Sequence, residues 1–239
     1  TAIEPEEGEL AEIDLVKNSR SVIVVTRGGY VKRMPLKTFG SQKRGTRGKK
    51  GTTAGSNTED NEVSHCFTCN DHDTLLMVTQ RGIAYGVRAF EVPTGTRTAK
   101  GVPIPSVLPV KADDVVTSVL TLSSFSEDEY CVLATEKGWI KKTPLAAFEK
   151  LTSRGLIIAT LEEGDRLRWC QICTDDDDIL IGSTKGVATR FEAEKLRATG
   201  RTSRGVRSMK LKDGDTIAEM NVLAKKKDEG DEKGNNGSE

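Results

Sequence analysis

Residues 131–142 read Cys-Val-Leu-Ala-Thr-Glu-Lys-Gly-Trp-Ile-Lys-Lys, and this stretch carries the pattern that decides the fold. The opening run, Cys131 to Ala134, is apolar without alternation, which is typical of a strand that is buried on both faces. Gly138 then supplies a turn, and Trp139 to Lys142 returns as a second strand. The stretch therefore predicts a β-hairpin.

The same hairpin pattern occurs four times along the chain, and successive turn glycines are 53, 56 and 48 residues apart. Self-similarity at about fifty residues, with several strands in each unit, is typical of propeller-like arrays. One such unit cannot bury its apolar face alone, so neighbouring units must cover it. The other three predicted hairpins are Val22–Val25 with Tyr30–Met34, Leu75–Val78 with Ile83–Tyr85, and Ile179–Ile181 with Val187–Arg190.

We therefore predict an all-β fold, a propeller-like β-pinwheel of repeated four-stranded antiparallel blades, with about four blades in residues 19–223. Residues 1–18 are acidic and weakly apolar, and we interpret them as a linker from a catalytic domain outside this chain. Residues 224–239 contain no large apolar side chain, which indicates a disordered charged tail or insertion. On this interpretation the chain is a fragment that stops after its fourth blade.

Each hairpin is followed by a basic residue and a glycine: Arg47-Gly48, Lys100-Gly101, Arg154-Gly155 and Arg204-Gly205. Glycine lets the backbone come close to a ligand, and Arg or Lys can reach several phosphate oxygens. The alternative is that these charges only keep a β-protein soluble and protect its sheet edges. Recurrence in step with the repeat favours phosphate binding, because scattered solubilising charge has no reason to follow the repeat.

The longest basic segment is 42–50, Gln-Lys-Arg-Gly-Thr-Arg-Gly-Lys-Lys, which contains no acid and no large apolar residue. Such a segment predicts a surface loop. Cations also recur on the second strand of the hairpins, where edge protection is the alternative role. The candidate phosphate-binding residues in loops are Gln42, Lys43, Arg44, Gly45, Thr46, Arg47, Gly48, Lys49, Lys50, Arg97, Lys100, Arg154, Arg201 and Arg204. The candidates on strands are Lys32, Arg33, Lys141, Lys142 and Arg190.

The net charge hides this pattern, because the chain has 36 Lys plus Arg and 36 Asp plus Glu. A neutral chain normally argues against a nucleic-acid partner. Here the acids gather in separate clusters, such as residues 4–12 and 175–178, while the cations gather in the loops. Charges that lie farther apart than the Debye length, about 8 Å at physiological salt, barely cancel. The loops can therefore attract a polyanion.

The segment Gln42–Gly48 resembles a named signature, the Q-R-R-G-G-K-G box in the C-terminal domain of the DNA gyrase A subunits. Lys43 and Arg47 keep the charge of the box, whereas Thr46 replaces a glycine. The hairpins on either side are also similar to that domain, and the likeness extends from about residue 8 to residue 223. Insertions such as the charged tail resemble those of plant and algal organellar gyrases more than typical bacterial ones.

The resemblance implies a domain built as a six-bladed pinwheel that wraps duplex DNA with a fixed hand and supports ATP-dependent negative supercoiling. The implied partners are duplex DNA and, through domains outside this chain, the gyrase B subunit with a second copy of the gyrase A subunit. No cofactor is expected in this fragment, since ATP and Mg act elsewhere in the enzyme. Nothing here resembles the tyrosine motif with which gyrase cuts DNA. The implied compartment is bacterial cytoplasm, or a plant or algal chloroplast or mitochondrion.

Two alternative sites are less favoured by the sequence. Cys66-x-x-Cys69 and Cys170-x-x-Cys173 have zinc-ligand spacing, but residues three apart on a strand face opposite sides of a sheet. We therefore predict strand cysteines, no metal, and a reducing compartment. The run Asp175–Asp178 lacks the interleaved spacing of a calcium loop and is interpreted as a polar turn.

Two other functions remain open on the sequence alone. The corresponding polypeptide of topoisomerase IV has a similar domain without an intact box, and Gln42–Gly48 argues against it. A protein-binding propeller scaffold is the second alternative. That role requires an apolar or aromatic patch on the rim, and the aromatic content is only 5%. The sequence contains no run of about eighteen apolar residues, so we predict no membrane-spanning helix.

Overall fold

The computed structural model describes residues 12–40, 44–45, 62–111 and 113–225. Within them, all four hairpins are present where the sequence predicts them. At each turn the glycine N–H donates to the carbonyl three residues earlier, at 3.0–3.1 Å, and the glycine φ lies between +74° and +88°. A side chain would strain this left-handed conformation, so the repeated glycine is a requirement of the turn. The hairpins are β1 (Arg20–Thr26) with β2 (Tyr30–Pro35), β4 (Thr74–Thr79) with β5 (Ile83–Arg88), β8 (Tyr130–Thr135) with β9 (Trp139–Pro144), and β12 (Asp178–Ser183) with β13 (Ala188–Glu192).

A third strand from the same repeat pairs antiparallel with the first strand of each hairpin. In every blade the register between these two strands shifts near the hairpin turn, for example between Val25 and Thr26. The third strands are β3 (Val63–Asn70), β7 (Val116–Leu122), β11 (Leu167–Cys173) and β15 (Ile217–Leu223).

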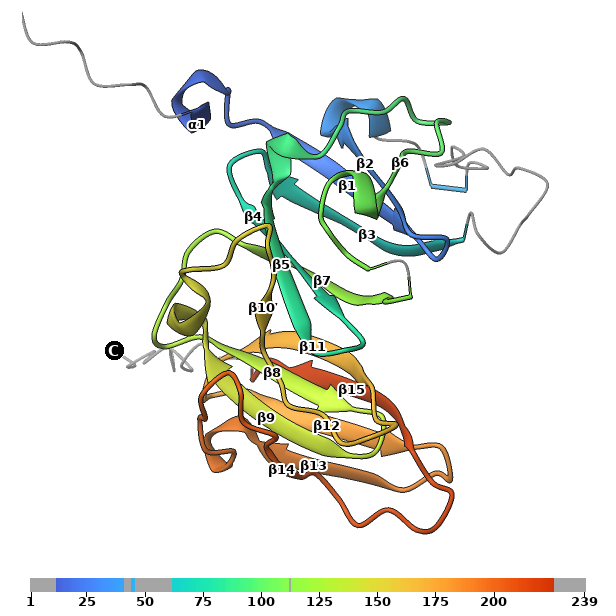
Figure 1. The fold of residues 1–239 in the computed structure, drawn as a ribbon, viewed down its shortest axis with the longest axis vertical. Helices are drawn as coiled ribbons and strands as arrows, with labels where there is room; N and C mark the ends of the chain where they lie inside the picture. Colours follow the sequence, from blue (N-terminus) through green and yellow to red (C-terminus); the bar gives the residue numbers. More distant parts are fainter. Residues whose placement is uncertain (1–11, 41–43, 46–61, 112, 226–239) are drawn as a thin grey trace, which may run out of the picture.

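The fourth strand of a blade comes from the following repeat, which the sequence did not indicate. The short strands β6 (Val102–Pro103), β10 (Leu156–Ile157) and β14 (Val206–Arg207) pair with β2, β5 and β9 of the preceding repeats. The sequence repeat predicted instead that each unit forms one blade. A sequence repeat and a structural blade are therefore offset, and consecutive blades are joined by exchanged strands (Figure 1).

The fourth sheet has three strands, in the order β13-β12-β15, instead of the expected four. Each of the other three sheets takes its last strand from a following repeat, and the described residues contain no fifth repeat. The all-β pinwheel of antiparallel blades is confirmed, with this one departure in strand number.

Alternate residues of the inner central strands, β4 and β8, pack into different cores. On β4, Leu75 and Met77 belong to the core between the first and second sheets, while Leu76 and Val78 belong to the core between the second and third. On β8, Val132 and Ala134 face the next core, where they meet the fourth sheet. This arrangement explains the uninterrupted apolar runs of β4 and β8, because both faces of these strands are covered by neighbouring blades.

Short helical turns connect these strands, and none of the described helices is long and apolar enough to cross a membrane. The predicted linker, residues 1–18, contributes only a four-residue helix to the described residues, and most of the predicted tail lies outside them. Both assignments stay predictions. The helices are α1 (Glu12–Leu15) and the 3-10 turns η1 (Leu36–Phe39), η2 (Ala89–Glu91), η3 (Ile104–Ser106), η4 (Leu145–Phe148) and η5 (Ala193–Lys195).

The cysteines are strand residues, and all five are free thiols. Cys66 is exposed and Cys69 buried, whereas Cys170 and Cys173 belong to the cores on the two faces of their sheet. The described residues hold no cluster of His, Cys, Asp and Glu suited to a metal. The aspartate run also forms a polar turn, in which Asp177 accepts hydrogen bonds from the Thr174 backbone N–H at 2.7 Å and hydroxyl at 3.0 Å.

Candidate nucleic-acid interface

The basic residue and glycine pairs introduce the exchanged strands. Gly101, Gly155 and Gly205 have φ values of +93°, +90° and +95°, and β6, β10 and β14 begin directly after them. A Cβ on Gly101 would lie 2.6 Å from the Val31 carbonyl oxygen, and one on Gly205 would collide with the backbone of Ile140. Only glycine allows the exchanged strand to approach the preceding blade this closely.

One interblade hydrogen bond recurs three residues after each of these glycines. The N–H groups of Ile104, Ile158 and Ser208 donate to the carbonyl oxygens of three turn glycines, at 2.8, 2.9 and 2.9 Å. The three exchanged segments therefore have equivalent positions on successive blades. The cations Lys100, Arg154 and Arg204, each one residue before the glycine, occupy equivalent positions as well, and all three are exposed.

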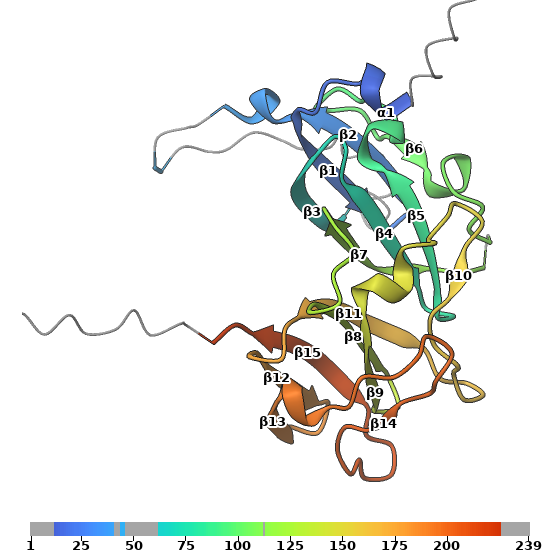
Figure 2. The same cartoon turned by 90° about the vertical axis from the view of Figure 1, so that its left-hand side faces the viewer.

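The exchanged strands form the outer edge of the array, a name we use for β6, β10 and β14 with the loops that lead into them. They lie at the opposite side of each sheet from β3, β7, β11 and β15. Those third strands contact one another from blade to blade. Figure 2 shows β6, β10 and β14 following one another along one side of the molecule. A row of cations thus runs along a single edge.

Two strand lysines that the sequence offered for phosphate binding are buried, and these predictions are corrected. Lys141 is 2% exposed, and its ammonium donates to the carbonyl oxygens of Ile158 at 2.8 Å, Gly200 at 2.9 Å, Ser203 at 3.2 Å, and Arg201. Lys32 is equally buried and donates to the carbonyls of Arg97 and Ala99, at 2.8 and 2.7 Å. Each lysine therefore holds the loop of the following repeat against its own blade.

Burial governs the protonation of both lysines. It lowers the pKa of Lys141 to about 8, and the charge of Arg201 adds to the effect. The pKa of Lys32 is lowered for the same reason, with a smaller contribution from Arg97. The carbonyl oxygens around each ammonium satisfy its donors, which a buried charge requires.

The residue after each of these lysines, Arg33 or Lys142, is also a cation that joins blades. The predictions that Arg33 and Lys142 bind phosphate are therefore corrected as well. Arg33 pairs with Asp71 at 2.9 Å and donates to the Val92 carbonyl at 3.1 Å, with little of its side chain exposed. Lys142 is buried, pairs with Asp175, and donates to the Ala193 carbonyl at 2.8 Å. Because both acids precede the first strand of the following repeat, these pairs tie one blade to the next.

The remaining candidate phosphate-binding residues differ in exposure and in their partners. Arg190 is exposed and pairs with Asp178 of its own hairpin. Arg97 and Arg201 are half-buried in the loops that Lys32 and Lys141 hold. Of the box, Arg44 and Gly45 are exposed, and Gly45 has a φ of +84°. The candidates Gln42, Lys43, Thr46, Arg47, Gly48, Lys49 and Lys50 lie outside the described residues.

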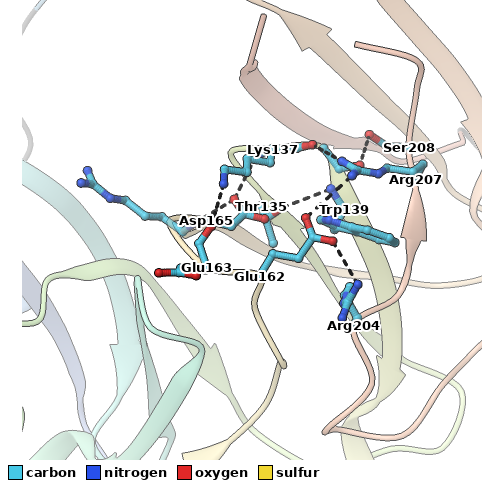
Figure 3. A network of polar contacts seen from close by, with 11 residues as sticks. Thr135, Lys137, Trp139, Glu162, Glu163, Asp165, Arg204, Arg207 and Ser208 are labelled. Carbon is cyan, nitrogen blue, oxygen red and sulfur yellow. Dashed lines mark hydrogen bonds and ion pairs between the residues drawn. The ribbon is translucent and has the colours of Figure 1, made fainter. Parts of the chain in front are cut away.

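The outer edge of the third blade carries an aromatic and cationic cluster that was not predicted from the sequence. The Arg207 guanidinium lies 4.1 Å from the centre of the Trp139 ring, and that of Arg204 lies 5.2 Å from it (Figure 3). In the first blade, Lys100 lies 3.9 Å from the centre of the Tyr30 ring. Arg207 had no repeat signal, because Pro103 and Ile157 occupy the equivalent positions.

Comparison with known families identifies the array. A family model described as "DNA gyrase C-terminal domain, beta-propeller" matches residues 20–70, 73–123, 129–174 and 177–224. These four segments are the four sequence repeats described above. The chain belongs to the DNA gyrase C-terminal domain family.

Individual gyrase sequences agree with this assignment. The chain is 44% identical over 225 residues to the DNA gyrase A subunit of Synechocystis, which covers 93% of this chain and 26% of that protein. It is 38% identical over 215 residues to a probable chloroplastic/mitochondrial DNA gyrase A subunit of Oryza sativa, which covers 90% of the chain and 23% of that protein. The chain thus spans about a quarter of the length of these gyrase relatives.

Solved structures share the fold. The C-terminal domain of DNA topoisomerase IV superposes with a TM-score of 0.71 at 22% identity, covering 88% of this chain and 63% of that one. A DNA gyrase A C-terminal domain superposes with a TM-score of 0.63 at 23% identity, covering 84% and 64%. At these identities the structural likeness supports the pinwheel architecture, while the family membership comes from the sequence.

Proposed function

We propose that this chain binds duplex DNA along its outer edge and bends it around the blades, as the DNA-wrapping part of a DNA gyrase A subunit. One observation carries the proposal. An exposed cation, Lys100, Arg154 or Arg204, stands at the same place in three successive blades, one residue before the glycine that begins the exchanged strand. A DNA duplex that follows this edge meets these cations in turn.

The contacts in this proposal are made to the phosphate backbone, so the sequence preference of binding is slight. Smoothly bending 20–30 base pairs by 40–90° costs on the order of 1–6 kcal/mol. A set of about six to ten phosphate contacts offsets that cost and makes binding steeply dependent on salt. The basic residues of segment 42–50 would add to this set of contacts.

In the intact enzyme, the wrapped segment would be presented to the DNA gate so that strand passage favours negative supercoiling. Cleavage, ATP and Mg would belong to other parts of gyrase, which include the B subunit with a second copy of the A subunit. The tyrosines of this chain have other surroundings, since Tyr85 is buried and the rings of Tyr30 and Tyr130 lie beneath lysine ammonium groups. The names of the relatives favour bacterial cytoplasm or a plant organelle as the compartment.

A salt titration of DNA binding tests the proposal. Replacing Lys100, Arg154 and Arg204 with Ala should reduce the slope of log K against log salt by about 2.7, or about 0.9 for each phosphate that is no longer neutralised. The matched control replaces Lys17, Arg20 and Arg168, which are exposed cations away from the outer edge, and should leave the slope unchanged. Equal slopes for wild type and the outer-edge variant would count against DNA binding at this edge.

The outer edge also carries two exposed apolar side chains, which are the feature that a protein-binding role would require. Ile157 and Val206 are more than half exposed, but each stands on a different blade beside a cation. Single exposed apolar side chains are ordinary on protein surfaces, whereas a docking patch is continuous. The same titration separates the two roles, since replacing Ile157 and Val206 with Ser should leave the salt slope of DNA binding unchanged.

A further inference from the structure

The outer edge of the third blade contains a cluster built from two repeats. Trp139 starts β9 in the third repeat. Arg204 and Arg207 belong to the segment of the fourth repeat that contains β14, which pairs with β9. Both guanidinium groups lie within the range of a cation–π interaction with the indole ring. Arg207 also donates to the Lys137 carbonyl at 2.7 Å, so its position is held from two sides.

A single carboxylate binds both arginines. Glu162, from the turn between β10 and β11, places one oxygen 3.0 Å from Arg204 Nη1 and the other 3.7 Å from Arg207 Nη2 (Figure 3). An oxyanion held by two guanidinium groups is also the arrangement in which arginines bind a phosphate. The cluster is open to solvent, since the side chains of Arg204, Arg207 and Glu162 are 48%, 53% and 31% exposed.

We propose that Arg204, Arg207 and Trp139 form a phosphate seat on the DNA path and that Glu162 occupies this seat when DNA is absent. The proposal rests on the DNA-binding function proposed above and names a site within it. Exposed ion pairs contribute little to stability, so a DNA phosphate can displace Glu162 without disturbing the fold. Entry of the phosphate then releases counterions from the DNA, which adds to the salt dependence of binding.

The first blade offers the corresponding seat without this internal competitor. Lys100 lies over Tyr30 there, and no carboxylate of the described residues pairs with it. The seats of the first and third blades therefore share an aromatic platform and a cation from the following repeat. They differ in that only the third is occupied by an acid of the described chain. DNA would bind freely at the first blade and would have to compete with Glu162 at the third.

Two variants of equal charge test this competition in the 239-residue chain. Glu162→Gln frees both arginines, whereas Glu163→Gln removes a carboxylate that has no ion-pair partner among the described residues. We expect Glu162→Gln to bind a linear DNA duplex several-fold more tightly than Glu163→Gln at physiological salt.

Replacing Arg204 and Arg207 with Ala provides the second arm, because the gain from Glu162→Gln should disappear in that background. The seat is disproved if Glu162→Gln binds DNA no better than Glu163→Gln, or if its gain persists without the two arginines. A purely structural role for Glu162 would give weaker binding in the Gln variant. Failure of the DNA-binding function itself is distinguishable, because wild type and the variant with Ala at Lys100, Arg154 and Arg204 would then have equal salt slopes.

Discussion

The junction between the third and fourth blades and the junction between the second and third use different chemistry for the same exchange of strands. The third residue after the turn glycine is Lys141 in one blade and Tyr85 in the other. Lys141 holds the incoming loop through three carbonyl oxygens, those of Gly200, Arg201 and Ser203. Tyr85 instead packs its ring against Gly155, whose Cβ, if it had one, would lie 2.7 Å from that ring.

The junction between the first and second blades follows the polar pattern, with Lys32 in the place of Lys141. Arg33 and Lys142 add ion pairs at these two junctions, whereas the equivalent residue between the second and third blades is Gly86, which approaches Leu151. All three junctions share the backbone pairing of the exchanged strand, but the side chains at the junction between the second and third blades, Tyr85 and Leu151, make apolar contacts instead of ion pairs. The strand cations Lys32, Arg33, Lys141 and Lys142 hold blades together, whereas the outer-edge cations Lys100, Arg154 and Arg204 are exposed.

The exchange itself depends most strongly on glycine. Gly205→Ala should destabilise the third and fourth blades by about 3 kcal/mol or more, because the new side chain would combine a strained φ of +95° with a clash against the Ile140 backbone. Urea unfolding followed by tryptophan emission reports on this region, since Trp139 and Trp169 both belong to the third sheet.

Gly200→Ala is the matched control in the same loop, because an added Cβ there would meet nothing within 4 Å. It should be neutral or stabilising by about 0.5 kcal/mol. Similar losses for the two variants would show that the close approach of Gly205 is not what the exchange requires.

Removing the hydrogen bonds of Lys141 should lower the free energy of unfolding less than Gly205→Ala does. It should lower it more than a change at the apolar junction does. Lys141→Met should lower the free energy of unfolding by about 2–4 kcal/mol, because it leaves buried carbonyl oxygens without their donor. Tyr85→Phe keeps the ring and should cost less than about 1 kcal/mol. The comparison of polar and apolar junctions would be wrong if the two substitutions had equal effects in urea.

The pH dependence of stability sharpens the same comparison. The pKa of Lys141 is about 8 when folded and about 10.4 when unfolded, so between these values the unfolded state binds more protons. Stability from this residue therefore rises with pH through this window, by about 1.4 kcal/mol per unit, and is constant below the folded pKa. The difference in unfolding free energy between wild type and Lys141→Met should widen accordingly, and a difference that narrows as the pH rises through this window would contradict the burial of the ammonium.

The sequence predicted the hairpins closely, because turn glycines and uninterrupted apolar runs are local signals. It could not predict the exchange of strands. The residues Leu156 and Ile157 carry the same apolar pattern whether they pair within their own repeat or with the preceding one. The choice depends on the conformation of Gly155 and on a long-range hydrogen bond from Ile158 to Gly82.

The candidate site was predicted only in part, because a sequence shows where cations recur but not which of them are buried or which distant residues they contact. Lys100, Arg154 and Arg204 were found from their constant distance to a glycine, and the structure places all three on one edge. Lys32 and Lys141 occupy the same strand position in two of the repeats but point into a shell of carbonyl oxygens, and charge in a sequence does not reveal burial. The cluster at Trp139 depends on Arg207 and Glu162, which come together only because a strand is exchanged.

The most direct test of the account is the linking number of nicked circular DNA that ligase seals in the presence of the chain. Wrapping along the outer edge predicts a shift in linking number. The shift should disappear when Lys100, Arg154 and Arg204 are replaced with Ala, and should persist when Lys17, Arg20 and Arg168 are replaced instead. A shift that survives loss of the outer-edge cations, or no shift with the wild-type chain, would contradict the proposal.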